Sequence, residues 1–316
     1  MGYSSEGINT DNRYVCLQSK HHFFTHADCV WLRISIYTAL AMVAFAANSV
    51  LCRMALGPAA IDPAGFTTIR LVSGALVLWL LAISGAIKGK GRAGSSGSWL
   101  SAAMLFLYAV LFSFAFVHLK AGTGALILFG AVQATMIITA IYRGERPLLL
   151  EYLGLAAALT GLIYLVLPGL QAPSLRGAAL MAVAGTAWGV YTLRGRGAVA
   201  PAAVTADNFM RSMPFALIAG LLLFKHVQIS AQGLLLAVLS GGLTSAMGYV
   251  IWYAALPNLS TTRAALVQLV VPVLAAGGGV LVLSEPLSAR LVLSAAMILG
   301  GIAVAITSRR KKTNTS

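Results

Sequence analysis

The sequence predicts an all-α polytopic membrane protein in which ten transmembrane helices form two inverted repeats of five helices. An apolar stretch of about twenty residues recurs roughly every twenty-five to thirty residues between Ser35 and Thr307. In a helix rising about 1.5 Å per residue, such a stretch crosses a hydrocarbon core of about 30 Å. The chain is also 59% hydrophobic and only 9% charged, against about 25% charged residues in soluble domains.

The ten spans follow in order along the chain and are separated by short polar or helix-breaking segments. Lys88 to Ser98 forms a polar linker after the second span, and Pro168 to Ser174 connects the fifth and sixth spans, because Pro and Gly disfavour helix there. The predicted spans are 34–55, 64–86, 98–118, 121–142, 150–168, 175–193, 204–224, 231–254, 260–283 and 287–307.

The basic residues predict the orientation of these spans. Because ten is even, both termini lie on one side of the membrane. If that side is the cytoplasm, cytoplasmic segments hold about fifteen Lys and Arg residues and the opposite loops about five. This asymmetry satisfies the positive-inside rule and predicts cytoplasmic termini in a bacterial inner (plasma) membrane. The net charge of +14 is therefore explained by topology, and no nucleic-acid partner is expected.

The chain resembles itself when it is shifted by about 140 residues. Glu145 then falls on Glu285, and Arg70 falls on Arg211 with a one-residue slip. Each half has five spans, an odd number, so the second half must enter the membrane upside down, and such repeats place a substrate site at their interface near the midplane. The predicted parts are a polar cytosolic tail 1–33, repeats 34–168 and 175–307, and a basic cytosolic tail 308–316.

The order of several short motifs resembles the EamA-type transporters of the drug/metabolite transporter superfamily over about 34–307. The carrying motifs are Phe45 and Asn48–Arg53, Arg70–Ala75, Gly124–Leu126, Gly144–Glu145, Trp188, Tyr249–Trp252, Ala264–Leu266, Val271–Val273 and Ser284–Pro286. The resemblance implies a secondary transporter with alternating access and with a cavity lined mainly by spans one, three, four, six, eight and nine. It also favours export over import. Pro272 departs from the repeat, since span four has Val132 there.

Polar and aromatic side chains within the spans are the candidates for substrate binding. Ser245, Tyr249 and Trp252 have the i, i+4, i+7 spacing of one helix face. Ring faces with a few amides and hydroxyls suit a small amphipathic solute, although aromatic residues also form interfacial belts. The full predicted set is Asn48, Tyr108, Phe112, Gln133, Trp188, Tyr191, Ser245, Tyr249, Trp252 and Gln268.

Arg70 and Arg211 are the basic residues well inside spans, and Asp207 precedes Arg211 by four residues, which suits an ion pair. We expect both guanidinium groups to reach toward an interface. Two roles stay open at this point, namely anchoring or gating between helices and contact with an anionic substrate. Pro272 is expected to kink span nine, either as a hinge or as a static packing feature.

Glu145 and Glu285 each stand before a predicted helix with Pro as the next or second-next residue, so we expect them to be helix caps. Since no Asp or Glu falls in the middle third of a predicted span, the sequence indicates no proton carrier, and uniport, exchange and a proton path through water stay open.

The predicted function is therefore transport of a small metabolite, an amino acid or related amphipathic solute, with export as the expected direction. A channel and a non-transporting membrane scaffold or receptor are the alternatives. The sequence shows no His-Glu-x-x-His run, paired Asp motif or metal-spaced cysteines, so we expect no enzyme, metal or cofactor. The expected partners are a small-molecule substrate and the lipid bilayer, and the sequence indicates no oligomeric state.

Overall fold

The computed structural model describes residues 26–87, 96–142, 149–167, 172–195, 198–222, 228–259 and 267–313. In these ranges the regular structure is helical, apart from one isolated bridge between Ile61 and Ile229. The elements are α1 (His26–Leu56), α2 (Pro63–Ile83), α3 (Trp99–Phe116), α4 (Ala121–Tyr142), α5 (Leu149–Val166), α6 (Leu175–Gly195), α7 (Pro201–Leu222), α8 (Ala231–Val238), η2 (Leu239–Met247), α9 (Gly248–Ala255), η3 (Leu256–Asn258), α11 (Val270–Leu283) and α12 (Ala289–Thr313).

These helices lie where the apolar stretches predicted them. The bounds of α4 coincide with the predicted span 121–142, whereas α1 begins at His26, inside the segment predicted as a polar tail. Within the described residues, five helices are long and apolar enough to cross a membrane. They are Trp31–Leu56, Pro63–Ile83, Trp99–Phe116, Ala121–Thr139 and Ala231–Ala255, the last of which joins α8, η2 and α9.

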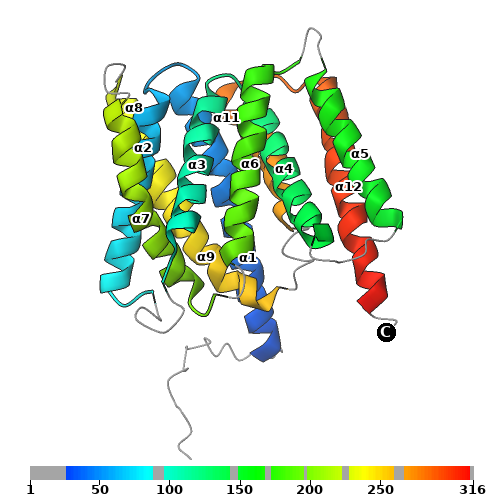
Figure 1. Ribbon diagram of the computed structural model, residues 1–316, viewed down its shortest axis with the longest axis horizontal. Helices are drawn as coiled ribbons and strands as arrows, with labels where there is room; N and C mark the ends of the chain where they lie inside the picture. The colour runs from blue at the N-terminus through cyan, green and yellow to red at the C-terminus, as the bar shows by residue number, and fades with distance from the viewer. Residues whose placement is uncertain are drawn as a thin grey trace, which may run out of the picture.

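The helices stand side by side in one bundle (Figure 1). Helix α1 begins and α12 ends at the same end of the bundle, which we call the terminal end, and the other end is called the distal end. Helix α5 packs on α12 at one edge, and α2 packs on α7 and η2 at the other. Between them, α6 packs on both α3 and α4, and α1 packs on both α9 and α11. The centre of the bundle is therefore surrounded by helices.

Small residues allow the edge helices to approach closely. A Cβ atom on Gly154 of α5 would lie 2.4 Å from the carbonyl oxygen of Gly301 of α12, and a Cβ on Gly301 would lie equally close to the carbonyl of Gly154. No side chain fits at such a distance, so backbone meets backbone here. Close contact through small residues is how helices associate where lipid supplies no hydrophobic drive.

The predicted eighth span is not a uniform α-helix. The chain runs through α8, then through the π-helical segment η2, and then through α9. Gly241 of η2 lies so close to α2 that an added Cβ would be 2.1 Å from the carbonyl oxygen of Arg70 and from the Oγ of Ser73. The π-helical turn thus coincides with a backbone contact against α2, and such turns are frequent at functional sites.

The ninth span is also interrupted. Residues 267–268 are helical, Leu269 is in a turn, and α11 starts at Val270. Pro272 accounts for this break, because proline cannot donate to the carbonyl four residues earlier and its ring clashes with that group. The interruption lies just before Pro272, where the sequence predicted a kink. A hinge role for Pro272 stays a prediction, and the remainder of the predicted span, 260–266, lies outside the described residues.

Candidate functional site in the centre of the bundle

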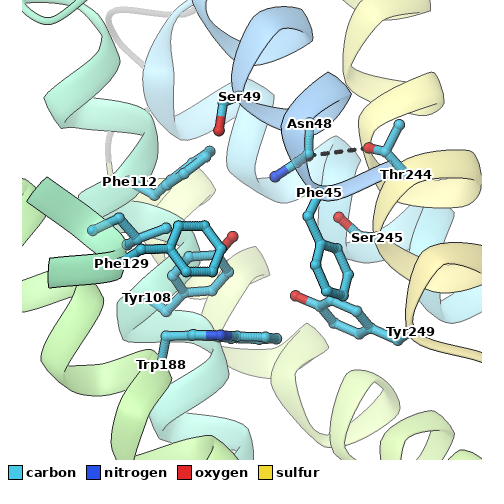
Figure 2. A pocket seen from close by; sticks show the side chains of 11 residues that line it. Phe45, Asn48, Ser49, Tyr108, Phe112, Phe129, Trp188, Thr244, Ser245 and Tyr249 are labelled. Carbon is cyan, nitrogen blue, oxygen red and sulfur yellow. Dashed lines mark hydrogen bonds between the residues drawn. The ribbon is translucent and has the colours of Figure 1, made fainter. Parts of the chain in front are cut away.

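A small cavity lies near the middle of the bundle between helices from both halves of the chain (Figure 2). Its volume is about 20 Å³, which is room for about one water molecule. In this conformation the cavity is therefore too small for a metabolite. Its walls come from α1, α3, α4, α6, η2 and α9, and the lining residues are Phe45, Asn48, Ser49, Tyr108, Phe112, Leu128, Phe129, Trp188, Thr244, Ser245 and Tyr249.

Aromatic rings form the side of the cavity that faces the terminal end. The indole of Trp188 lies 4.9 Å from the ring centroid of Tyr108 and 5.0 Å from that of Tyr249, with Tyr191 stacked on it at 5.3 Å. Phe45 meets Tyr249 edge to face at 5.7 Å. Figure 2 shows Trp188 beneath Tyr108 and beside Tyr249. These contacts separate the cavity from the helices' terminal ends.

Asn48 is the main polar group of the lining. Its side-chain oxygen accepts hydrogen bonds from the hydroxyl of Ser240 at 2.7 Å and from that of Thr244 at 3.2 Å. Both hydroxyls belong to η2, so the π-helical segment fixes the orientation of the amide. With the oxygen held in this way, the amide nitrogen is turned toward the open space (Figure 2) and could donate to a bound solute.

Arg70 lies directly behind the wall of the cavity. Its Nε donates to the hydroxyl of Ser245 at 3.2 Å, and its Nη2 donates to the hydroxyl of Tyr108 at 3.1 Å. The guanidinium also lies over the ring of Phe112, with Cζ 5.1 Å from the centroid. The side chain is only 2% exposed, so the expectation that it reaches toward an interface is wrong. Tertiary packing turns it into the bundle instead.

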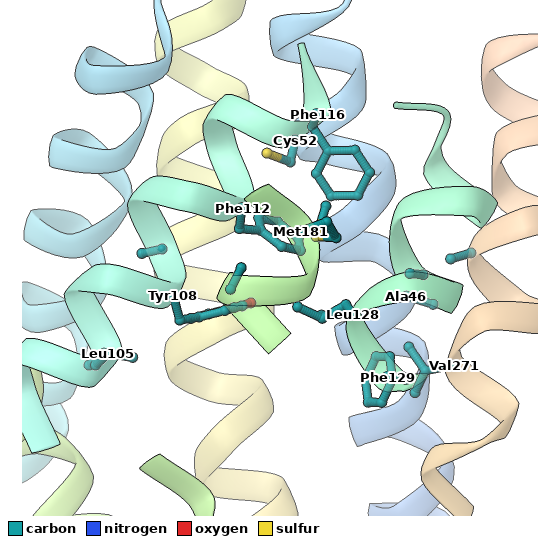
Figure 3. Close-up of a cluster of buried hydrophobic side chains, with 14 of the residues drawn as sticks. Ala46, Cys52, Leu105, Tyr108, Phe112, Phe116, Leu128, Phe129, Met181 and Val271 are labelled. Atoms are coloured by element: carbon teal, nitrogen blue, oxygen red, sulfur yellow. The ribbon is translucent and has the colours of Figure 1, made fainter. Parts of the chain in front are cut away.

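An apolar cluster lies on the distal side of the cavity. Phe112 and Phe116 of α3 meet edge to face at 4.6 Å, and Met181 of α6 lies beside them (Figure 3). Gly124 of α4 permits this packing, since a Cβ there would be 2.5 Å from the ring of Phe116. The buried side chain of Cys52 lies in the same cluster.

Nearer the distal end than this cluster, Arg53 and Glu285 form a part-buried ion pair, with 3.2 Å between Nε of Arg53 and Oε1 of Glu285. The other carboxylate oxygen accepts from the backbone N–H of Ala121 at 2.9 Å. Glu285 thus accepts a hydrogen bond from the first turn of α4. The expectation that it caps α12, the helix that follows it in the chain, is therefore wrong. The cap of α12 is Ser288, whose hydroxyl accepts from the N–H of Leu291 at 3.1 Å. Glu145 lies outside the described residues.

At the terminal end, the predicted pair of Asp207 and Arg211 is present, with 3.1 Å between Oδ2 and Nε. The same carboxylate oxygen accepts from the N–H of Gly97 at 2.7 Å, and the guanidinium of Arg211 lies over the ring of Trp99. This pair therefore connects α7 to the start of α3. Unlike Arg70, Arg211 is partly exposed and has a carboxylate partner.

Six of the ten predicted substrate-binding residues line the cavity, namely Asn48, Tyr108, Phe112, Trp188, Ser245 and Tyr249. The other four do not. Tyr191 stacks behind Trp188, Trp252 contacts Phe45 at 6.2 Å, and Gln133 and Gln268 are buried in α4 and before α11. Residues 267–283 of the ninth span contribute no lining residue, although the resemblance implied that this span would.

Five lining residues were not among the predicted set, namely Phe45, Ser49, Leu128, Phe129 and Thr244. Phe45 precedes Asn48 by three residues and Ser49 by four, so the helix face that contains Phe45 and Asn48 could have identified both Phe45 and Ser49. Thr244 could have been found from its position next to Ser245 in a run of small polar residues. Leu128 and Phe129 carry no such signal, because an apolar residue in an apolar helix is ordinarily core or lipid-facing.

Apolar helices packed around a small polar and aromatic cavity define the class of the protein, an α-helical integral membrane protein. Residues 175–307 match the EamA-like transporter family. An uncharacterised protein of Pseudomonas aeruginosa, PA1977, is 49% identical over 277 residues, which are 88% of this chain and 96% of that protein. The chain therefore belongs to the EamA-like transporter family of the drug/metabolite transporter superfamily, whose members are membrane transporters and not, in general, enzymes.

More distant relatives agree with this membership. Two proteins of Archaeoglobus fulgidus, each described as an uncharacterised transporter, are 26% and 27% identical and cover 64% and 75% of this chain, or 74% and 85% of their own length. A solved crystal structure shares the fold, with a TM-score of 0.63 at 20% identity, and the match covers 87% of this chain and 99% of the other.

Proposed function

We propose that this protein is a secondary transporter that carries a small amphipathic metabolite, an amino acid or a related solute, out of the cell by alternating access. The observation that carries the proposal is the cavity itself, which has aromatic rings on one side and the amide of Asn48 with neighbouring hydroxyls on the other. Such a lining matches a solute with an apolar body and a polar head group. The export direction rests on the family resemblance.

The proposal includes ten spans in two inverted repeats, 34–168 and 175–307. Its support is the way the helices pair. In the proposed repeat, α1 corresponds to α6, α3 to α9, α4 to α11 and α5 to α12. Helix α6 packs on α3 and α4, and its counterpart α1 packs on their counterparts α9 and α11. Helices α5 and α12, which are counterparts, pack on each other. An exchange of the two halves by a two-fold axis would leave this set of pairs unchanged. The axis would then pass near the cavity, as expected for inverted repeats.

Alternating access requires that each end of the bundle can open in turn. We propose that the terminal end faces the cytoplasm and is closed by Trp188 with its neighbours and by the pair of Asp207 and Arg211. The distal end would be closed by the phenylalanine cluster and by the pair of Arg53 and Glu285. Because the cavity has room for only about one water molecule, a solute must displace aromatic side chains when it binds.

Transport is tested by counterflow in proteoliposomes that contain the purified full-length protein, with a series of labelled amino acids and related metabolites. A carrier gives saturable uptake that is accelerated by unlabelled solute on the opposite side. Uptake without saturation would indicate a channel, and no uptake of any solute would favour a non-transporting scaffold. Loss of preloaded solute from expressing cells, compared with uptake by the same cells, tests the direction.

The cavity assignment is tested by a matched pair of tryptophan variants. Trp188 lines the cavity, whereas Trp79 of α2 is 43% exposed on the outside of the bundle. We expect Trp188→Ala to reduce counterflow at least tenfold while the protein still purifies as a folded species, and Trp79→Ala to retain it. Equal activity of both variants would refute the assignment of substrate binding to this cavity.

A further inference from the structure

The buried guanidinium of Arg70 has no carboxylate beside it. Within the part of the chain that the structure describes, the two ion pairs join Arg53 to Glu285 and Arg211 to Asp207. The groups that contact the guanidinium are the hydroxyls of Ser245 and Tyr108 and the ring of Phe112, and none of them is a carboxylate. Arginine stays charged in proteins. The centre of the bundle therefore carries a positive charge that no acidic residue described there offsets.

The hydrogen bonds of Arg70 are also incomplete. Its Nε and Nη2 use the hydroxyl oxygens of Ser245 and Tyr108, but the buried Nη1 has no hydrogen-bond partner among the described residues. Buried polar groups are nearly always satisfied, and each exception calls for an explanation. A charged donor in a site of low dielectric has the strongest demand for a partner. An anionic ligand bound beside Arg70 would balance its charge and accept a hydrogen bond from Nη1.

The cavity is the place from which an anion would reach this group. Both hydroxyl partners of Arg70 are lining residues, and so is Phe112, over whose ring the guanidinium lies. If the side chain of Tyr108 or Ser245 rotated away, the guanidinium of Arg70 would become accessible from the cavity. The planar fork of arginine matches a carboxylate, which it binds through two parallel N–H donors.

The rest of the lining restricts the ligand further. No lining residue is charged, so the single charge of Arg70 compensates a monoanion, whereas a dianionic phosphate would keep one uncompensated charge in the bundle. A cation without a carboxylate would be repelled. The rings of Phe45, Trp188 and Tyr249 provide the apolar surface for the remainder of the molecule.

We propose that Arg70 is the receptor for the carboxylate of the transported solute, so that the substrate class is monocarboxylates with an apolar or aromatic body. This inference rests on the proposed transport function and names the substrate class of the same cavity. The competing role is structural, in which Arg70 merely holds Tyr108 and Ser245 in place.

The experiment uses purified full-length protein in proteoliposomes, loaded with a solute that gives counterflow, and measures competition by four probes. L-phenylalanine and 3-phenylpropionate carry a carboxylate, whereas L-phenylalaninamide and phenethylamine do not. We expect both carboxylates to compete at least tenfold better than the other two. In Arg70→Gln the advantage of the carboxylates should disappear, and in Arg70→Lys part of it should return, since a lysine keeps the charge without the fork.

Arg290→Gln is the matched control. Arg290 also lies over a tyrosine ring, that of Tyr164, but on the α5–α12 edge of the bundle, and its substitution should leave the competition pattern unchanged. A purely structural role of Arg70 predicts that all four probes weaken together in Arg70→Gln, which would overturn the inference. Equal competition by all probes in the natural protein would do the same, even if no Arg70 variant folds.

These outcomes are distinct from failure of the proposed function. If the natural protein moves no solute at all, the transport proposal and the substrate class fall together. If it moves solutes without regard to their carboxylate, transport stands and only the role of Arg70 is refuted.

Discussion

Arg53 and Glu285 lie 232 residues apart in the chain and form an ion pair at the distal end of the bundle. The contact extends beyond the pair, because Arg53 also donates to the backbone carbonyls of Phe116 and Val117, at 2.9 and 3.2 Å. Glu285 in turn accepts from the N–H of Ala121. One cluster therefore ties the end of α1 to the α3–α4 connection and to the segment between α11 and α12.

We predict that Glu285→Gln opens the distal end more often. A glutamine can still accept from the N–H of Ala121 but loses the charge attraction to Arg53, which for a partly exposed pair is about 1 kcal/mol. An equilibrium between closed and open forms would then shift about fivefold. In a chain with Cys16 and Cys29 replaced by serine, the buried Cys52 should react with a thiol reagent several times faster.

Asp207→Asn is the control for this experiment, since it weakens the pair at the terminal end and leaves the distal cluster intact. With an impermeant reagent added from the distal side, Asp207→Asn should not speed the reaction of Cys52. If Glu285→Gln left the rate unchanged as well, the ion pair would have no part in closing the distal end.

A second prediction concerns the glycine at which η2 meets α2. In Gly241→Ala, the added methyl group would overlap the carbonyl of Arg70 and the hydroxyl of Ser73, so η2 must move away from α2. Overpacking of this kind costs about 1–3 kcal/mol and would also draw Ser245 away from Arg70. We expect a lower thermal unfolding midpoint and at least a tenfold loss of counterflow.

The neighbouring glycine is the matched control for that substitution. A Cβ on Gly242 would be 3.1 Å from a methyl group of Val77, at the end of a side chain that can shift. Gly242→Ala should therefore lower the midpoint much less than Gly241→Ala. If both variants behaved alike, the close approach of η2 to α2 would not be what fixes this part of the site.

A third prediction separates backbone packing from helix propensity at the α5–α12 edge. Gly154→Ala places a methyl group against the carbonyl of Gly301, whereas a Cβ on Gly300 would have nothing within 4 Å. We expect Gly154→Ala to lower the thermal unfolding midpoint, and Gly300→Ala to leave it unchanged or raise it, because alanine favours helix by up to about 1 kcal/mol. A lower midpoint in Gly300→Ala alone would contradict this account of the edge.

The positions of the helices could be predicted from the sequence because a span must satisfy its own backbone hydrogen bonds and needs about twenty apolar residues to do so. This is why α4 and α6 begin at the predicted residues. The polar and aromatic residues at mid-span were also informative. Asn48, Trp188 and Tyr249 carry polar groups at mid-span, which favoured a buried position, and the structure brings them together at the cavity.

What the sequence could not supply is which neighbour each side chain meets. The same arginine in a span can extend toward an interface or turn inward, and only the packing of α2 against η2 and α3 decides this for Arg70. The π-helical turn is the second reason. It coincides with the contact of Gly241 against the backbone of α2 and with the hydrogen bond between Ser245 and Arg70. Hydropathy carries no signal for such a turn.

The last prediction tests the orientation on which the gating proposals depend. Ser96 and Lys120 are both exposed and stand at the two ends of α3, so in our proposal Ser96 faces the cytoplasm and Lys120 the outside. In a chain without native cysteines, Lys120→Cys should react with an impermeant thiol reagent in intact cells. Ser96→Cys should react only after the cells are opened. The reverse pattern would place both termini outside and exchange the two proposed gates, because α3 crosses the membrane once between these residues.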